Sequence, residues 1–190
     1  MIKALYNLDN RSINLASFGI CLFSLIIAKY YFEEFLGLEP CYLCITQRVF
    51  LLLAGIIFLI STIHNPKNLF KKVYSYVAIF FCSAGAYFSI KQLYLQSLPE
   101  DQVPQCGPPV EYLLETFSGF EVISMLVQGD GNCAKVQWEF LFISMPGWVL
   151  VIFLALIAIT AFQLKRTSHG DLSIMIISLN LCFQQFDLKN

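Results

Sequence analysis

Residues 40–63 read PCYLCITQRVFLLLAGIIFLISTI, a Cys-x-x-Cys motif that leads directly into a long apolar run. The run from Ile45 to Ile63 carries a single charge, that of Arg48, close to its start. A helix crosses a bilayer with about 20 mostly apolar residues, and this run is long enough. It lacks the alternation of a barrel strand, and a helix satisfies its own backbone hydrogen bonds in hydrocarbon. We therefore predict a transmembrane helix with two cysteines at its beginning.

Three further apolar stretches of similar length lie at residues 14–32, 73–90 and 146–164. Hydrophobic residues make up 57% of the chain and charged residues 13%, whereas soluble domains carry about 25% charged residues. The sequence therefore predicts an all-α membrane protein, a four-helix transmembrane bundle within residues 1–164. Residues 165–190 form a cytoplasmic tail of unassigned role. The net charge of −1 gives no sign of a nucleic-acid partner.

The positive charges between these stretches are unevenly distributed and predict the orientation in the membrane. Eight fall on one side: Lys3, Arg11, Lys67, Lys71, Lys72, Lys165, Arg166 and Lys189. Four fall on the other side: Lys29, Arg48, Lys91 and Lys135. Because positive residues concentrate in the cytoplasm, both termini are predicted to be cytoplasmic. The connections at residues 33–44 and 91–141 are then a short and a long outer loop.

This orientation sorts the seven cysteines by compartment. Cys41 and Cys44 lie where the short outer loop enters its helix, and Cys106 and Cys133 lie in the long outer loop. All four face the side on which disulfides persist. The other three have no predicted redox role, Cys21 and Cys82 being buried packing residues and Cys182 a reduced residue of the tail.

The Cys-x-x-Cys motif brings two sulfurs together at a helix start, where a reversible disulfide can form. We expect Pro40 in the first helical turn, because the N–H that proline lacks is unpaired there anyway. The positive end of the helix favours a thiolate at Cys44. Arg48, one turn further, adds a fixed charge and a hydrogen-bond donor for a carbonyl oxygen. Such a dithiol suits electron exchange with a quinone in the membrane.

Two other interpretations of this motif remain open. Cys41 and Cys44 can form half of a zinc site, which needs two further ligands at suitable spacing. Arg48 can simply extend its charge to the membrane interface.

Cys106 and Cys133 form a second pair, in the turn-rich segments Val103–Pro109 and Gly129–Cys133. Such segments are accessible to another protein. A disulfide between them either staples the loop or belongs to a relay, because thiolates attack disulfides through mixed intermediates. Two mobile pairs can then pass electrons in sequence.

Two apolar features of the long loop point to the membrane surface. The run Val122–Val127 is too short to span and is predicted to lie in the interface, near the Cys41–Cys44 pair. Trp138 and Trp148 flank the start of the fourth span and are predicted interfacial anchors.

Together these features resemble the DsbB family of bacterial inner-membrane proteins, which form disulfides and reduce quinone. The shared features are four spans, cytoplasmic termini, Pro-Cys-x-x-Cys followed by Arg48, and a cysteine pair in the second outer loop. Local matches are LQSLPEDQVPQCGPP at residues 95–109 and GNCAKVQWEFLFISMPGW at residues 131–148. The resemblance covers about Ala16 to Gln163 and is more specific than Cys-x-x-Cys alone.

The resemblance implies a thiol:quinone oxidoreductase with its redox cysteines in the periplasm. A DsbA-like thioredoxin-fold oxidase would attack a Cys106–Cys133 disulfide and form a mixed disulfide with Cys106. The electrons would pass to Cys41–Cys44, and Cys44, nearest Arg48, would deliver them to ubiquinone or menaquinone. The implied site is catalytic Cys41, Cys44, Cys106 and Cys133, with Arg48 and Cys44 binding the quinone and no metal.

The sequence departs from the family pattern at two places. Many relatives carry a histidine three residues before the Leu95-Gln96 pair, where this chain has Gln92. The position therefore lacks a protonatable side chain beside the implied quinone. The tail at residues 165–190 is also longer than usual, and its apolar run at residues 172–179 is too short to span.

Two other classes of protein are alternatives. A membrane thiol and quinone enzyme related to vitamin K epoxide reductase is also a four-helix bundle with Cys-x-x-Cys, but its active pair normally comes later in the order of spans. A non-enzymatic scaffold of the tetraspanin type has four spans and a large disulfide-bearing loop. It usually shows a Cys-Cys-Gly run, which this sequence lacks.

Overall fold

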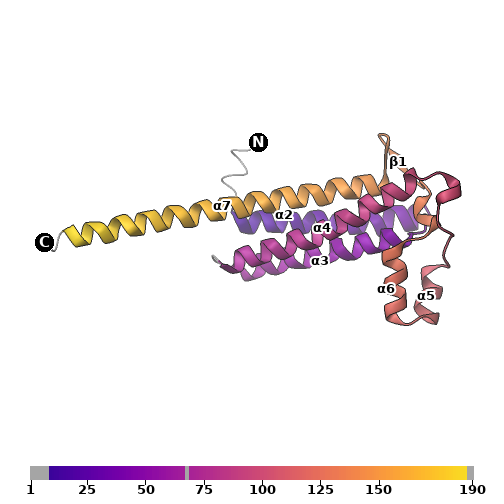
Figure 1. The fold of residues 1–190 in the computed structure, drawn as a ribbon, viewed down its shortest axis with the longest axis horizontal. Coiled ribbons are helices and arrows are strands. Elements are labelled where there is room, and N and C mark those ends of the chain that lie inside the picture. Colours follow the sequence, from indigo (N-terminus) through magenta and orange to yellow (C-terminus); the bar gives the residue numbers. More distant parts are fainter. Residues whose placement is uncertain (1–8, 67–68, 188–190) are drawn as a thin grey trace.

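The computed structural model describes residues 9–66 and 69–187, and beyond Arg166 it describes only the path of the backbone. Its long helices are α2 (Asn10–Ile26) with its continuation as the π-helix η1 (Ile27–Phe35), α3 (Tyr42–His64), α4 (Leu69–Ser97) and α7 (Met145–Asp187). They lie side by side in one bundle (Figure 1). In the described parts, four segments are long and apolar enough to cross a membrane: Asn10–Phe35, Tyr42–His64, Leu69–Ser97 and Met145–Arg166. The predicted all-α fold with four spans is confirmed.

The helices extend beyond the apolar stretches that predicted them. Glu33 and Glu34, expected in the short loop, lie in η1, so the connection to α3 covers only residues 36–41. Cys41 is the N-cap of α3, with an extended backbone (φ −72°, ψ 168°). Asn65 ends α3 in the left-handed conformation (φ 44°), which asparagine tolerates better than most residues.

The centre of the bundle is packed with small residues and rings from all four long helices. Its buried residues are Cys21, Leu51, Ala54, Phe58, Ala78, Cys82, Ala86, Phe153 and Leu156. A Cβ at Gly85 would overlap the ring of Phe153, so glycine permits the close approach of α4 and α7. Cys21 and Cys82 are buried here, which confirms their prediction as packing residues. Large apolar side chains such as Phe23, Phe80 and Leu154 face outward, as contact with lipid requires.

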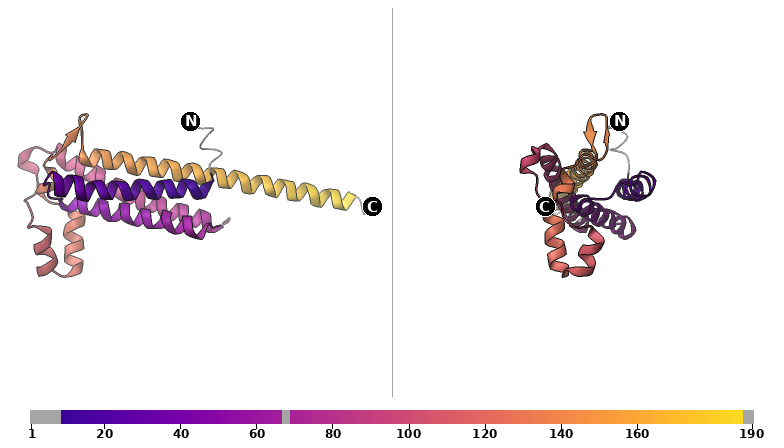
Figure 2. Two further views of the ribbon diagram at one scale, coloured as in Figure 1. Left: turned by 180° about the vertical axis from the view of Figure 1, so that it is seen from behind. Right: turned by 90° about the vertical axis from the view of Figure 1, so that its right-hand side faces the viewer.

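The end of the bundle where α3 and α7 begin carries the long connection, and we call it the cysteine end. This connection contains the helices α5 (Val110–Thr116) and α6 (Gly119–Gln128), the turns η2 (Glu100–Gln102) and η3 (Gly131–Ala134), and the antiparallel strands β1 (Glu139–Phe140) and β2 (Ile143–Ser144). α5 and α6 project to one side of the bundle and the β-hairpin projects to the opposite side (Figure 2). The apolar run Val122–Val127 lies in α6, and its place in the membrane interface stays a prediction.

α7 continues as one helix past the other three, to Asp187 (Figure 1). The segment from residue 165 on is therefore helical up to Asp187 and is not a separate short helix. Its role remains unassigned. Cys182 lies outside the residues whose side chains are described.

Candidate active site

The four predicted catalytic cysteines all lie at the cysteine end. Cys41 and Cys44 come from the start of α3, Cys133 lies in η3, and Cys106 lies in the extended segment after η2. The described cysteines are all free thiols. Cys41 and Cys133 are buried, Cys44 is half-buried and Cys106 is exposed. The group therefore has one sulfur accessible to a protein in solution and three within the molecule.

Cys41 and Cys44 are brought together by the first turn of α3, and their sulfurs lie 2.8 Å apart. The free N–H groups at the start of the helix point toward this region, and the positive end of the helix dipole stabilises a thiolate. Pro40 precedes the N-cap, so its predicted position in the first turn was wrong. The reason is that Cys41 keeps an extended backbone and the helix begins only at Tyr42.

A buried amide contacts both sulfurs of this pair. Gln92 of α4 donates one hydrogen bond to the Cys41 sulfur (3.2 Å) and one to the Cys44 sulfur (3.3 Å). The side-chain oxygen of Gln92 accepts a hydrogen bond of 2.7 Å from Gln47, on the next turn of α3. Both glutamines are 3% exposed. Position 92 thus holds a neutral donor directed at the dithiol.

The end of α6 positions η3 over the start of α3. The hydroxyl of Thr46 donates to the Leu126 carbonyl (3.1 Å), and the ammonium of Lys91 donates to the Val127 carbonyl (2.9 Å). These bonds attach α6 to α3 and α4. They bring Cys133, a few residues further along the chain, against the N-terminus of α3.

Cys133 packs with Cys41 in one buried cluster at the N-terminus of α3. The two thiols interact there, and the backbone N–H groups of Leu43 and Asp130 also face the Cys133 sulfur. The interaction with Cys41 is the main reason that the pKa of Cys133 is lowered, while burial and the hydrogen bond from the Cys133 thiol to the Asp130 carboxylate oppose it. The same interaction raises the pKa of Cys41. Of the two cysteines, Cys133 is therefore the one whose ionisation is favoured.

The Cys106 segment lies against η3. The N–H of Gly131 donates to the Gln105 carbonyl (3.1 Å), and the N–H of Gly107 donates to the Asp130 carboxylate (3.0 Å). A Cβ at Gly131 would overlap the backbone just before Cys106 and lie 3.2 Å from its sulfur. Glycine at position 131 therefore permits this approach.

Asp130 organises the turn that carries Cys133. Its carboxylate, 4% exposed, accepts hydrogen bonds from Gly107, from the Asn132 amide (2.7 Å) and from the Cys133 thiol (3.3 Å). One buried acid thus connects the segments that carry the two loop cysteines.

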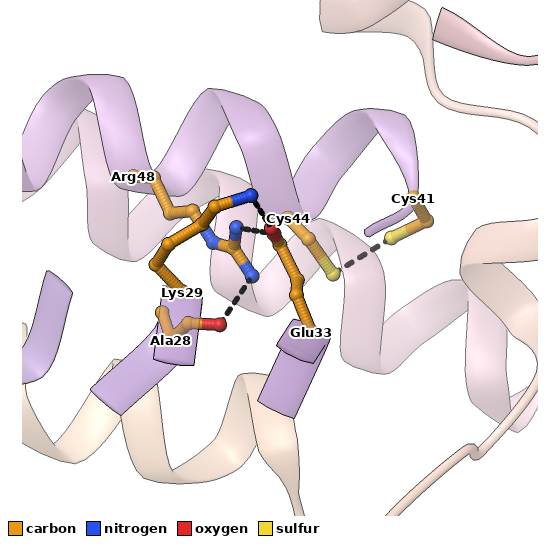
Figure 3. Close-up of polar contacts among 6 residues, drawn as sticks. All are labelled: Ala28, Lys29, Glu33, Cys41, Cys44 and Arg48. Atoms are coloured by element: carbon orange, nitrogen blue, oxygen red, sulfur yellow. Dashed lines mark hydrogen bonds and ion pairs between the residues drawn. The ribbon is translucent and has the colours of Figure 1, made fainter. Parts of the chain in front are cut away.

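Arg48 lies one turn after Cys44, as predicted, and residues of the neighbouring helix η1 hold its side chain in place (Figure 3). Its guanidinium forms an ion pair with Glu33 and donates to the Ala28 carbonyl (3.4 Å). Glu33 also pairs with Lys29 at 2.9 Å. A guanidinium has more N–H donors than these two contacts use, so Arg48 can still bind a further acceptor.

A cavity of about 200 Å³ lies beside Cys44 and Arg48. α2 and η1 form one side, α3 forms the back and α7 forms the other side. Its polar lining groups come from Ser24, Cys44, Gln47 and Arg48, and the remaining lining is dominated by apolar side chains, among them Phe32, Leu51, Trp138, Pro146 and Trp148. A lipid-soluble ligand with a polar carbonyl end fits such a cavity.

Comparison with known proteins decides the family. The family described as Disulfide bond formation protein DsbB matches residues 10–163. The chain belongs to the DsbB family. Three relatives, each named disulfide bond formation protein B, illustrate the similarity. The Hahella chejuensis protein is 45% identical over 159 residues, which cover 84% of this chain and 96% of the relative. The Saccharophagus degradans protein is 47% identical over 153 residues (80% and 92%), and the Marinobacter nauticus protein is 43% identical over 155 residues (81% and 92%).

This DsbB family member is therefore a multi-pass membrane protein with a redox role in disulfide bond formation. Sequence reasoning singled out Cys41, Cys44, Cys106, Cys133 and Arg48, and all five lie at the cysteine end. Their individual roles stay proposals.

Three residues of the DsbB site were missed by sequence reasoning: Glu33, Gln47 and Asp130. Glu33 carried a usable signal, because a charge within a span, here that of Arg48, usually pairs with an opposite charge, and Glu33 in the adjoining loop was an available partner. Gln47 and Asp130 carried none, since nothing in a turn or an apolar helix indicates which distant side chain an amide or acid will contact.

Proposed function

We propose that the chain is a thiol:quinone oxidoreductase of the bacterial inner membrane. It reoxidises a DsbA-like periplasmic thioredoxin-fold oxidase and passes the electrons through two cysteine pairs to a membrane quinone. The observation that carries this proposal is the contact between Cys133 and Cys41, with Cys44 beside an apolar cavity. The four sulfurs thereby form a route from an exposed thiol to a site open to lipid-soluble molecules.

The first step takes place at Cys106, the exposed cysteine. A thiolate of the partner attacks the Cys106 sulfur of a Cys106–Cys133 disulfide, which forms a mixed disulfide and releases the Cys133 thiolate. The second thiolate of the partner then attacks the partner sulfur that is bonded to Cys106. This closes the disulfide of the partner and releases the Cys106 thiolate. The partner leaves oxidised, and the loop pair is left reduced.

The second step transfers the electron pair to α3. The Cys133 thiolate attacks the Cys41 sulfur of a Cys41–Cys44 disulfide and releases the Cys44 thiolate. Cys106 then attacks Cys133, which restores the loop disulfide and releases Cys41. The backbone N–H of Leu43, which faces the Cys133 sulfur, supports this order because it is a donor to the attacking thiolate that does not depend on a thiol proton at Cys41.

The third step uses the cavity between α2, α3 and α7. A quinone supplies the electron sink, since it takes up two electrons and two protons and becomes a quinol. The lining fits such a molecule, with Arg48 placed to donate to a carbonyl oxygen and aromatic rings around the remainder. Cys41 and Cys44 return to the disulfide as they give up their electrons and thiol protons. Gln92, which donates to both sulfurs, stabilises the thiolate that precedes this step.

The experiment is turnover in proteoliposomes that contain ubiquinone or menaquinone, with a reduced DsbA-like protein as substrate. We expect one quinone reduced for each partner dithiol oxidised, and no turnover with Cys41→Ser or Cys44→Ser. Cys21→Ala, in the packed core, is the matched control and should keep turnover. Wild-type protein that leaves the quinone unreduced contradicts the proposal.

The proposed orientation has its own test. A membrane-impermeant maleimide added to intact cells under reducing conditions should label Cys106, the exposed cysteine. Labelling of Cys106 only in inverted vesicles would reverse the orientation.

A further inference from the structure

The connection that leads into α7 ends in a β-hairpin with an unusual turn. Phe140 pairs with Ile143 across the two strands, and Leu141 and Phe142 form the turn between them. Both turn residues have left-handed backbones, with φ 54° and φ 62°. Two-residue turns of this kind favour Asn and Gly, because large side chains are strained at positive φ. The hairpin therefore presents two large apolar side chains where its own backbone disfavours them.

Neither side chain contributes to the core. Leu141 is 65% exposed and Phe142 is 97% exposed. The stretch Phe140–Trp148 contains no charged residue. The tip projects sideways from the bundle beside the start of α7, on the side opposite α5 and α6 (Figures 1 and 2). It therefore lies at the level where a membrane-spanning helix begins.

The base of the hairpin packs against the cavity wall. The Phe140 ring stacks on Trp138, with ring centres 6.0 Å apart, and lies 6.2 Å from the ring of Trp148. The Trp148 indole N–H donates to the Phe140 carbonyl (3.2 Å). On the other side, Trp138 meets Phe32 of η1 edge-to-face at 5.0 Å. The two tryptophans and Phe32 all line the cavity, so the hairpin and the cavity share one aromatic cluster.

We infer that the Leu141–Phe142 turn inserts into the outer leaflet of the bilayer and thereby holds the aromatic wall of the cavity at the point where a ligand arrives from the lipid. The partner is the acyl-chain region of the membrane, at the depth of the first turn of α7. The insertion stands on the hairpin alone. Its consequence for quinone access, between α2 and α7, rests on the proposed function.

Lipid fits this surface better than a partner protein does. Exposed apolar side chains next to two tryptophans, at the beginning of a membrane span, are typical of interfacial anchors. The charged residue of the hairpin, exposed Glu139, lies at its base opposite Ser144, so the apolar side chains stand alone at the tip. An apolar tip with its charge at the base suits insertion of the tip into lipid.

The insertion is tested by photocrosslinking in proteoliposomes of phosphatidylethanolamine and phosphatidylglycerol. p-Benzoylphenylalanine at position 142 should give phospholipid adducts by intact-protein mass spectrometry. The same amino acid at position 102, exposed in η2, should give far fewer. Equal adduct yields at the two positions overturn the inference. So does preferential crosslinking of position 142 to an added DsbA-like protein, which would make the turn a protein-docking site.

The consequence for the cavity is tested with the double variant Leu141→Asn, Phe142→Gly. This pair suits the turn, so the hairpin stays folded while both apolar side chains are lost. We expect a several-fold higher KM for a long-tailed ubiquinone in the bilayer, and little change for an analogue with a single isoprene unit. Unchanged KM for both quinones refutes the role in access. If wild-type protein reduces neither quinone, the proposed function fails while the lipid adducts still decide the insertion.

Discussion

Gln47 donates a hydrogen bond of 2.7 Å to the side-chain oxygen of Gln92, and this contact directs the NH₂ group of Gln92 toward the sulfurs of Cys41 and Cys44. An amide presents an oxygen at one end and two N–H donors at the other, so the contact from Gln47 fixes which end is directed at the Cys41 sulfur. The Cys44 sulfur lies 3.3 Å from the nitrogen and 3.7 Å from the oxygen of the same amide. The dithiol thus has a donor whose charge does not change with pH.

The first prediction concerns the loss of this donor. Gln92→Leu keeps a similar volume but removes the hydrogen bonds to both sulfurs. A hydrogen bond to a charged group contributes about 1.5–3 kcal/mol, so we expect quinone reduction to slow by about tenfold or more. Single-turnover quinone absorbance measures this rate, and Gln92→Asn is the variant that keeps an amide. Equal rates for Gln92→Leu and wild type would mean that the amide only fills space.

The second prediction concerns pH. Gln92→His introduces an imidazole, whose unperturbed pKa is about 6.5. The imidazolium form stabilises a thiolate more than neutral imidazole does, so the rate should rise as the pH falls through this region. The groups that face position 92 are Cys41 and Cys44, with Lys135 in the adjoining polar cavity, and both enzymes share them. The rates of Gln92→His and of the wild type are measured from about pH 5.5 to about pH 8, and the difference between the two profiles isolates the effect of residue 92. Identical profiles would contradict a direct action of residue 92 on the dithiol.

The third prediction follows from the interaction between Cys41 and Cys133. Cys41→Ala removes the interaction that chiefly lowers the pKa of Cys133, whereas burial continues to raise it. The pKa of Cys133 should therefore move upward, and its thiolate should appear only at higher pH. The measurement is iodoacetamide alkylation of Cys133 against pH in reduced protein, followed by mass spectrometry. Cys44→Ala, which removes no direct contact with Cys133, should shift the midpoint less.

The fourth prediction concerns the close approach at Gly131. Gly131→Ala places a Cβ against the backbone before Cys106 and should push this segment away from η3, at a cost of about 1–3 kcal/mol. We expect slower oxidation of the partner and easier reduction of the loop disulfide. Gly119→Ala is the matched control, because a Cβ there meets nothing within 4 Å. Equal rates of partner oxidation in the two variants would mean that the fit of Gly131 against the Cys106 segment does not contribute to activity.

The fifth prediction concerns Arg48. Arg48→Ala removes a charged donor from the cavity wall, and we expect the KM for quinone to rise about tenfold. Glu33→Gln keeps the size of the side chain but loses the ion pair that holds the guanidinium, so its effect should have the same direction and be smaller. Steady-state kinetics in proteoliposomes check both. Normal kinetics for Arg48→Ala would leave Arg48 as an interfacial anchor only.

The helices were predictable because each apolar run has the length that the bilayer imposes. Their ends were not, since polar residues such as Glu33 and Glu34 continue the helix in η1 once Arg48 and Lys29 pair with Glu33. Local hydropathy reflects the free-energy cost of a charge in a membrane span. It does not indicate which oppositely charged side chain offsets this cost.

The site was predictable as far as its chemistry rests on residue type. Cysteine pairs, and an arginine one turn away from one of them, can be recognised in a sequence by residue type and spacing. The contacts that tune them do not, because Gln92 and Cys44 are 48 positions apart and meet only when α3 packs on α4. The contact of Cys133 with Cys41 likewise depends on where α6 ends.

The passage of electrons from Cys133 to Cys41 is tested most directly by trapping the disulfide between them. In the double variant Cys44→Ser, Cys106→Ser, oxidation should join Cys41 to Cys133, as identified by peptide mass spectrometry. In the matched variant Cys44→Ser, Cys133→Ser, which leaves Cys106 as the loop cysteine, the corresponding Cys41–Cys106 disulfide should form far more slowly. Free thiols at both Cys41 and Cys133 after oxidation, or faster joining of Cys41 to Cys106, would contradict the account.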